Sequence, residues 1–157
     1  MTSRARIVAL ASALVLVPAL SLAATYTGSA SLGAMSDPDA HGTASLTIDA
    51  GNKLTAVVEV WNMDPSMSHT TTVKNFTCGG SGSTFLGLND VAVDATGHGL
   101  ATTVIQLTSS QVTSLVNTAH DISVYALSGT IGTCGNVIFG PTPVEPSTWG
   151  HVKALYR

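Results

Sequence analysis

The fold is decided by residues 43–61, which read TASLTIDAGNKLTAVVEVW. Apolar and polar side chains alternate before and after residues 49–52, whose Asp, Gly and Asn favour a tight turn. Alternation with a period of two places the apolar side chains on one face of a strand. Residues 43–61 therefore predict a β-hairpin with one buried face and one exposed face.

The same alternation recurs along most of the chain. It predicts a second pair of strands at residues 88–94 and 99–107. Further strands are expected at residues 26–32, 67–76, 122–127 and 136–139. Residues 108–111 interrupt the pattern, because they offer N-cap side chains before apolar residues at helical spacing, and so predict one short helix. Seven or eight short strands separated by turns indicate an all-β antiparallel sandwich or Greek-key barrel.

Residues 1–24 have the three parts of a cleavable secretory signal. Two arginines precede an apolar run, and small residues at 21–24 form a cleavage region. The run is shorter than the roughly 20 residues that span a bilayer, although an uncleaved membrane anchor is the alternative. We expect cleavage after Ala23 or Ala24, and a mature chain without a transmembrane segment. The leader is typical of a bacterial protein of the periplasm, cell envelope or cell surface.

The expected mature chain carries few charges. After residue 24 it has four Lys and Arg residues against nine Asp and Glu residues, a net charge of −5. This balance provides no basic surface for nucleic acid or anionic lipid. Small uncharged residues predominate instead, and such a surface is suited to being covered by partners in an envelope.

The chain contains two cysteines, Cys78 and Cys134. Export would place them in an oxidising compartment, where an even pair most simply forms a disulfide. The alternatives are two free thiols or a cysteine metal site. Neither cysteine has a second cysteine or a histidine at the spacing of a zinc finger.

Several segments follow one another in the order of a known family. They are WNM at 61–63, VKNFTC at 73–78, LNDVAVDATG at 88–97, ISVYA at 122–126 and TCGNVI at 133–138. This succession resembles the copper/zinc superoxide dismutase superfamily and its bacterial relatives, including CHRD-type domains, over roughly residues 25–139. The resemblance implies a Greek-key β-barrel of about eight strands, in which the two cysteines form a disulfide.

The resemblance does not extend to the copper ligands of the family. Its His-x-His pair before the first cysteine falls on Thr72 and Lys74, and its late copper-binding histidine falls on Tyr125. Threonine binds copper poorly, and a protonated lysine does not bind it. No metal ligand is therefore transferred from the family to this chain.

Copper could instead be bound by ligands that the family does not use. Met67 and His69 lie two residues apart on a predicted strand, and a thioether with an imidazole suits copper. His120, with Asp121 as an orienting carboxylate, is the third candidate. The alternative is that the methionines pack in the barrel and the histidines make ordinary hydrogen bonds.

The expected barrel domain ends at residue 140, and residues 141–157 read PTPVEPSTWGHVKALYR. The three prolines exclude a central strand and predict an extended arm. Trp149, Leu155 and Tyr156 would anchor this arm in a groove of a partner. Alternatively, the arm folds back over an exposed edge of its own barrel.

Two functions are consistent with these features. The first is an exported superoxide dismutase-like barrel without the family's copper ligands, which serves as an accessory or structural subunit of a bacterial surface-layer or outer-membrane assembly and binds other envelope proteins. The competing hypothesis is a copper-only superoxide dismutase or copper-binding protein that protects the envelope from oxidative stress. Whether the chain is an enzyme depends on which of the two is correct.

Overall fold

The computed structural model describes residues 26–140, which form eleven strands and one helix. The elements in chain order are β1 (Tyr26–Ala34), β2 (His41–Ile48), β3 (Lys53–Trp61), β4 (Ser68–His69), β5 (Thr71–Asn75), β6 (Thr84–Gly87), β7 (Val91–Ala92), β8 (Gly99–Gln106), α1 (Ser109–Asn117), β9 (His120–Tyr125), β10 (Ile131–Asn136) and β11 (Ile138–Phe139). The leader predicted at residues 1–24 and the arm predicted at 141–157, with Trp149, Leu155 and Tyr156, lie outside the described residues.

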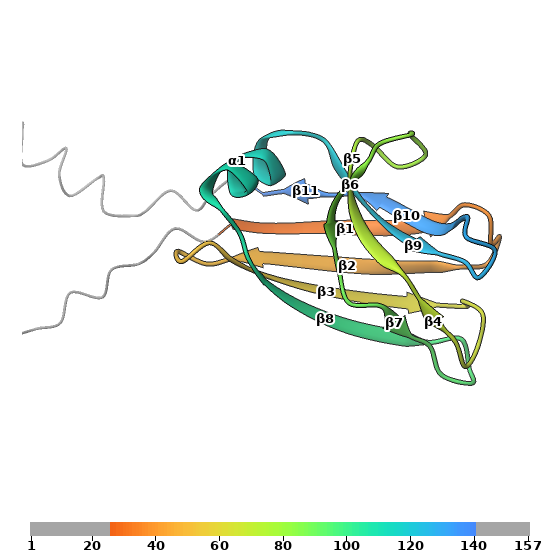
Figure 1. Ribbon diagram of the computed structural model, residues 1–157. Helices are drawn as coiled ribbons and strands as arrows, with labels where there is room; N and C mark the ends of the chain where they lie inside the picture. The colour runs from red at the N-terminus through yellow and green to blue at the C-terminus, as the bar shows by residue number, and fades with distance from the viewer. Residues whose placement is uncertain (1–25, 141–157) are drawn as a thin grey trace, which may run out of the picture.

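The strands form a curled antiparallel sheet, a half-barrel, in the order β6-β5-β9-β10-β1-β2-β3-β8. The short strand β11 pairs with β1, and β4 and β7 form a separate two-stranded sheet. Figure 1 shows β1, β2, β3 and β8 side by side, with β5, β6, β9 and β10 on the other side of the curl and α1 at one end. The predicted all-β class with one short helix is thus confirmed.

The hairpin predicted at residues 43–61 is formed by β2 and β3, which pair over their whole length. Asp49 closes its turn, because one carboxylate oxygen accepts hydrogen bonds of 2.9 Å from the backbone N–H groups of Gly51 and Lys53. Alternate side chains of both strands are buried, including Leu46 and Leu54, at 1% and 0% exposure. They join residues from the other side of the curl in one apolar core.

The helix α1 begins where the sequence predicts it. Thr108 is its N-cap, and a capping box joins the side chain and backbone of Thr108 to those of Gln111. The apolar residues Val112 and Leu115 are buried and belong to the core. No helix within residues 26–140 is both long enough and apolar enough to cross a membrane.

Two strand predictions differ from the structure around β4 to β8. The predicted strand at 67–76 is divided at Thr70 into β4 and β5. The predicted pairing of 88–94 with 99–107 is reduced to a bridge between Val93 and Gly99, because β7 pairs with β4 instead. The bounds of these short strands are set by contacts between residues far apart in the chain, and the local alternation of side chains does not predict such contacts.

Strands β6 and β10 were not predicted at their observed positions, since β10 begins at Ile131 and the prediction began at residue 136. The central residues of β10 are buried on both faces, so they do not alternate. Gly135 lies directly against the backbone of Ser31, where there is no room for a Cβ atom. A glycine at such a close approach weakens the strand signal in the sequence.

Candidate functional site

Strands β5 and β9 lie next to each other and are buried on both faces. Val73 and Ile122 pair across the two strands and contribute to the apolar core. The opposite side of the two strands, here called the outer face, carries polar side chains. These are Thr72, Lys74, Asp121 and Ser123, all 9% exposed or less. Buried polar groups need hydrogen-bond partners, so the outer face is a candidate binding site.

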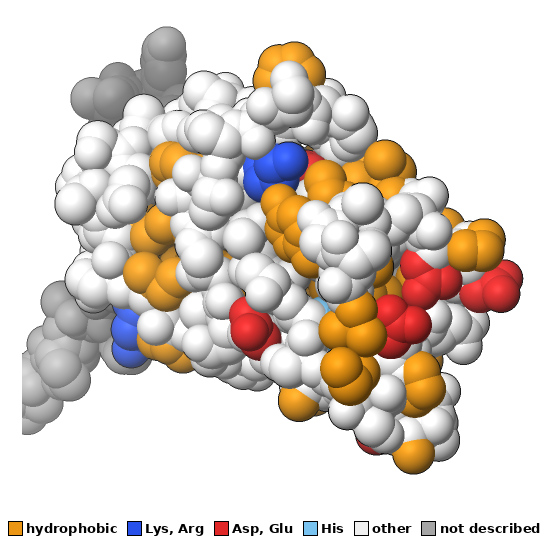
Figure 2. Space-filling model, turned by 45° about the vertical axis from the view of Figure 1, so that its right-hand side comes forward, with side chains coloured by type: hydrophobic (Ala, Val, Ile, Leu, Met, Phe, Trp, Pro, Cys, Tyr) orange, Lys and Arg blue, Asp and Glu red, His pale blue; other side chains and the backbone are white. Residues whose placement is uncertain are grey.

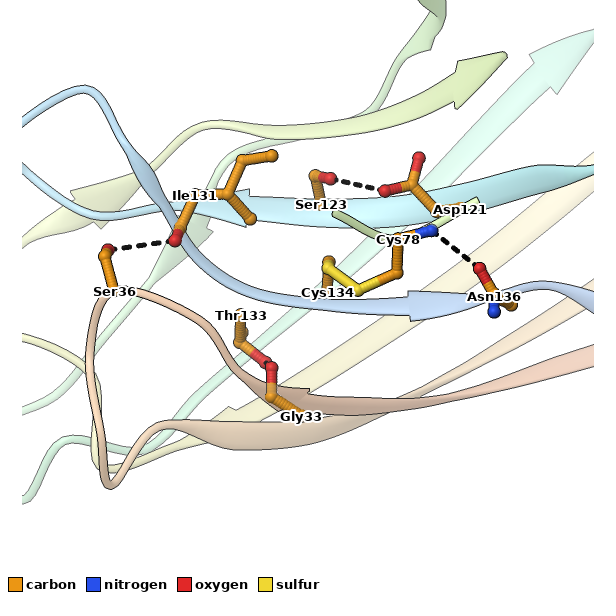
Figure 3. The surroundings of a disulfide bond; sticks show 9 residues. All are labelled: Gly33, Ser36, Cys78, Asp121, Ser123, Ile131, Thr133, Cys134 and Asn136. Carbon is orange, nitrogen blue, oxygen red and sulfur yellow. Dashed lines mark hydrogen bonds between the residues drawn. A yellow bond between two sulfur atoms is a disulfide. The ribbon is translucent and has the colours of Figure 1, made fainter. Parts of the chain in front are cut away.

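A disulfide between Cys78 and Cys134 lies beside the outer face (Figure 3). It connects the loop after β5 to β10, with the two Cα atoms 5.7 Å apart. The backbone N–H of Cys78 also donates a hydrogen bond of 2.7 Å to the side chain of Asn136. Cys134 pairs in register with Ser123, so the disulfide fixes a loop next to the polar residues.

Two buried polar atoms on the outer face have no hydrogen-bond partner. The hydroxyl of Ser123 donates to one carboxylate oxygen of Asp121 at 2.9 Å, and the other oxygen of Asp121 is unpaired. The hydroxyl of Thr72 is also unpaired. Burial raises the pKa of Asp121, opposed by the hydrogen bond from Ser123 and by the charge of Lys74. Lys74 lies opposite Asp121 in the strand register but does not come within 4.0 Å to form an ion pair.

An open pocket of about 470 Å³ continues the outer face toward the end of β9. Its lining is mostly hydroxyl-bearing, with small and apolar residues at the turn after β9. The lining residues are Ser68, Thr70, Thr72, Thr84, Tyr125, Ala126, Leu127 and Gly129. None of these residues carries a charge at neutral pH, so the pocket is polar but neutral.

The three positions that the sequence resemblance aligns with the family's copper ligands lie on one face, but the fold does not bring all three together. Lys74 pairs with Asp121, which is four residues, or about 13 Å of strand, from Tyr125. Thr72 and Tyr125 both line the pocket, and Lys74 follows Thr72 on the same face of β5. They provide a hydroxyl, a phenol and an ammonium group. The outer face therefore lacks an imidazole at each of these positions and can form hydrogen bonds there instead.

His69 and Met67 do not share a surface. The imidazole of His69 is 1% exposed, with its nitrogens 2.8 Å from the carbonyl oxygen of Tyr125 and 3.1 Å from that of Asp64. Met67 lies outside β4 and is 43% exposed. Both nitrogens of His69 thus contact backbone carbonyls, and its thioether neighbour faces solvent.

His120 is buried at the other end of β9. Its Nδ1 lies 3.1 Å from the carbonyl oxygen of Lys74, and its Nε2 lies 2.9 Å from the hydroxyl of Thr118. His69 contacts Tyr125, five residues further along β9, which corresponds to about 16 Å of strand. The structure therefore does not bring His69 and His120 together. Residues 26–140 contain no cluster of three or more His, Cys, Asp or Glu side chains suited to a metal ion.

Two other histidines lie in a row across β2, β3 and the start of β8. The ring of His41 stacks on Trp61 at 5.7 Å between centroids, and His98 contacts the same indole at 5.5 Å. The Nε2 atom of His98 lies 2.9 Å from a carboxylate oxygen of Glu59. His41, His98 and Glu59 each have a partner within the row, so these contacts explain their positions without a ligand.

The sequence interpretation missed most of the pocket. Ser68, Thr70 and Thr84 were not singled out, because alternating hydroxyl residues normally indicate a face exposed to solvent. A usable signal was present in the polar residues at every second position of both β5 and β9. The positions that the sequence resemblance aligns with the family's copper ligands lie within that pattern.

No protein-family model matches the sequence, and no curated protein matches it significantly. The resemblance to the superoxide dismutase superfamily therefore depends on the sequence segments quoted above.

Proposed function

We propose that this chain is an exported superoxide dismutase-like β-barrel that has exchanged the family's copper site for a hydrogen-bonding face and serves as an accessory or structural subunit of a bacterial cell-envelope assembly. The observation that carries this proposal is the position of Thr72, Lys74 and Tyr125 on one face. The family would hold copper there with imidazoles.

The strand order supports the superoxide dismutase-like part of the proposal. Strands β1, β2 and β3 are consecutive neighbours, whereas β9 lies between β5 and β10, and β10 pairs with β1. Such non-sequential neighbours are what Greek-key connections produce. The disulfide from the loop after β5 to β10 is also the pairing that the family resemblance implies.

The surface supports a role that depends on contacts. Figure 2 shows a face on which uncharged polar side chains and backbone predominate, while blue and red areas are few. Among the described residues, Phe76, Leu127 and Ile138 are large apolar side chains that are 58%, 53% and 70% exposed. A weakly charged surface with exposed apolar side chains loses little by being covered by a partner.

Copper analysis of the purified mature chain tests the proposal most directly. We expect the chain to be isolated from copper-supplemented cells with far less than stoichiometric copper and without superoxide turnover. The combined variant Thr72→His, Lys74→His and Tyr125→His should gain copper, because position 72 neighbours position 74 on β5 and position 125 diagonally on β9, so that two imidazoles can reach one ion. The matched control, Ser45→His with Thr47→His, places a His-x-His pair on the exposed side of β2 and should gain less.

Stoichiometric copper in the wild-type chain, with superoxide turnover that is lost in His69→Ala, would overturn the proposal. That result would establish the competing copper hypothesis, in which His69, Met67 or His120 is a ligand. If the wild-type chain holds no copper, the triple variant still tests the assignment of the outer face. If it gains no more copper than the β2 control, the superoxide dismutase-like assignment of the outer face is wrong.

Fractionation of the source cells tests the envelope role and the predicted arm. We expect the full mature chain to sediment with the envelope and a chain ending at residue 140 to be released into the soluble fraction, because the arm would carry the anchoring residues Trp149, Leu155 and Tyr156. A triple alanine variant of these residues should behave like the truncated chain. Unchanged sedimentation of both variants would exclude docking through the arm.

A further inference from the structure

We infer that the hydroxyl-lined pocket beside Tyr125 is a binding site for a neutral carbohydrate, such as a sugar unit of an envelope or extracellular glycan. The inference goes beyond the accessory role proposed above. It rests on one part of that proposal, export, because an exported protein encounters such glycans. It concerns the pocket on the outer face, whose lining is described above.

The chemistry of the lining matches that of a sugar. Ser68, Thr70 and Thr84 carry hydroxyls, and a hydroxyl can rotate to donate or to accept a hydrogen bond. Sugar hydroxyls have the same dual character. A purely apolar ligand would cover these groups without replacing their hydrogen bonds to water, which costs free energy for each unpaired group.

The pocket also has an aromatic and apolar part. Tyr125 is half-buried on one strand, and Leu127, which is 53% exposed, lies at the following turn. A pyranose ring has an apolar face of C–H groups that can pack on such side chains, while its hydroxyls reach the threonines. One wall for C–H groups and another for hydroxyls is the division of surface that an amphipathic sugar requires.

The charge of the lining excludes an ionic ligand as the preferred occupant. No lining residue is charged, and a charge transferred from water to a neutral pocket loses hydration without gaining an ion pair. The nearest cation on the face is Lys74, which follows Thr72 on β5 and lies opposite the lining residue Thr84, but is not itself part of the lining. Because the lining itself holds no charge, we expect a neutral sugar to bind more tightly than a uronic acid, and a charged probe measures any contribution of Lys74.

The backbone of β5 and β9 offers no free edge to an extended peptide. β5 is paired on one side with β6 and on the other with β9, and β9 is also paired with β10. The carbonyl of Thr70 accepts from the N–H of Tyr125. A peptide adding as a strand needs an unpaired edge, which β5 and β9 do not offer; among the described strands of this sheet that line the pocket, only β6, the last strand on that side, has one. Over β5 and β9, recognition must therefore come from side chains, as it does for a sugar.

The size of the pocket fits a short glycan segment. Its volume of about 470 Å³ lies in the range of roughly 300 to 1,000 Å³ that is common for small-molecule sites. The pocket is open on one side, so a longer chain can continue beyond it.

Saturation-transfer NMR on the mature chain, residues 25–157, tests the inference. The probes are cellotriose, maltotriose and tri-N-acetylchitotriose, with trigalacturonate as the charged comparison. We expect at least one neutral trisaccharide to bind with a Kd below about 5 mM, a typical strength for a small shallow site. Trigalacturonate should bind at least about tenfold more weakly than that sugar, because the lining offers no positive charge.

Three variants locate the binding. Thr84→Val removes one lining hydroxyl at an exposed position and should weaken binding about fivefold, the loss of one hydrogen bond. Tyr125→Leu should weaken it about tenfold by removing the ring. Thr47→Val is the matched control, because it removes an exposed hydroxyl on β2 and should leave the Kd unchanged.

Failure of all three neutral trisaccharides to bind would overturn the inference, as would a preference for trigalacturonate. Equal affinities of Thr84→Val and Thr47→Val would also overturn it, since binding would then occur elsewhere. These outcomes leave the proposed function to be decided by its own copper and fractionation experiments. Thr84→Val keeps the test valid if Tyr125→Leu fails to fold.

Discussion

At the scale of single residues, Asp121 is the most unusual group in the described chain. Its side chain is buried, one of its oxygens has no partner, and the ammonium of Lys74 does not pair with it within 4.0 Å. Burial favours the neutral form and raises the pKa of the carboxyl group. The cost of ionising Asp121 in the folded state is a consequence of its burial, which the hydrogen bond from Ser123 and the charge of Lys74 oppose.

We expect Asp121→Asn to raise the melting temperature at neutral pH. The pKa of Asp121 is higher in the folded chain than in the unfolded chain. Its carboxyl group therefore makes its full contribution to the free energy of unfolding below the unfolded pKa, and that contribution is lost as the pH rises through the folded pKa. The asparagine variant removes that loss and can still accept the hydrogen bond from Ser123. The measurement is the melting temperature of both proteins near pH 7 and near pH 3.

The advantage of the variant should disappear near pH 3, where the wild-type carboxyl is protonated in both states. The exposed substitution Asp90→Asn serves as the matched control and should show little difference at either pH. A gain of equal size at both pH values would contradict the assignment of the effect to ionisation.

At the scale of elements, α1 shows how a local signal can define structure. Thr108 accepts a hydrogen bond from the backbone N–H of Gln111, and the side chain of Gln111 accepts one from the backbone of Thr108. The two bonds satisfy N–H groups that a helix terminus leaves unpaired. Val112 and Leu115 then anchor the helix in the core.

Thr108→Ala should lower the free energy of unfolding by about 1 kcal/mol, the usual cost of losing an N-cap side chain. Chemical denaturation followed by circular dichroism measures the change. The control is Thr113→Ala, the same substitution at an exposed position inside α1, where alanine has the higher helix propensity. Destabilisation of equal size in both variants would show that the capping box is not the cause.

At the scale of the whole molecule, the disulfide connects distant parts of the chain. Cys78 and Cys134 are 56 residues apart, and the bond joins the loop after β5 to β10. Such a link restricts the unfolded chain and holds the loop beside the outer face. The polar layer at Ser123 therefore lies next to a long-range covalent contact as well as between paired strands.

Replacing both cysteines by serine should lower the free energy of unfolding by about 4 kcal/mol on the chain-entropy model for a loop of 56 residues. Denaturant titration of the double variant measures this loss. Wild-type protein under a strong reductant should approach the stability of the variant. Alkylation of Cys78 and Cys134 in the unreduced, unfolded chain would contradict the bond.

Local sequence determined the β2–β3 hairpin, the start of α1 and the all-β class. The reason is that alternation, turn residues and caps act within a few residues, as in the segment 43–61. Only the tertiary structure decided that Thr72, Asp121 and Ser123 would be buried, and that Thr84 and Tyr125 would share a pocket with Thr70. It also separated His69 from His120. Burial of an outer strand face depends on which loop covers it and which strands become neighbours, and those contacts join residues far apart in the chain.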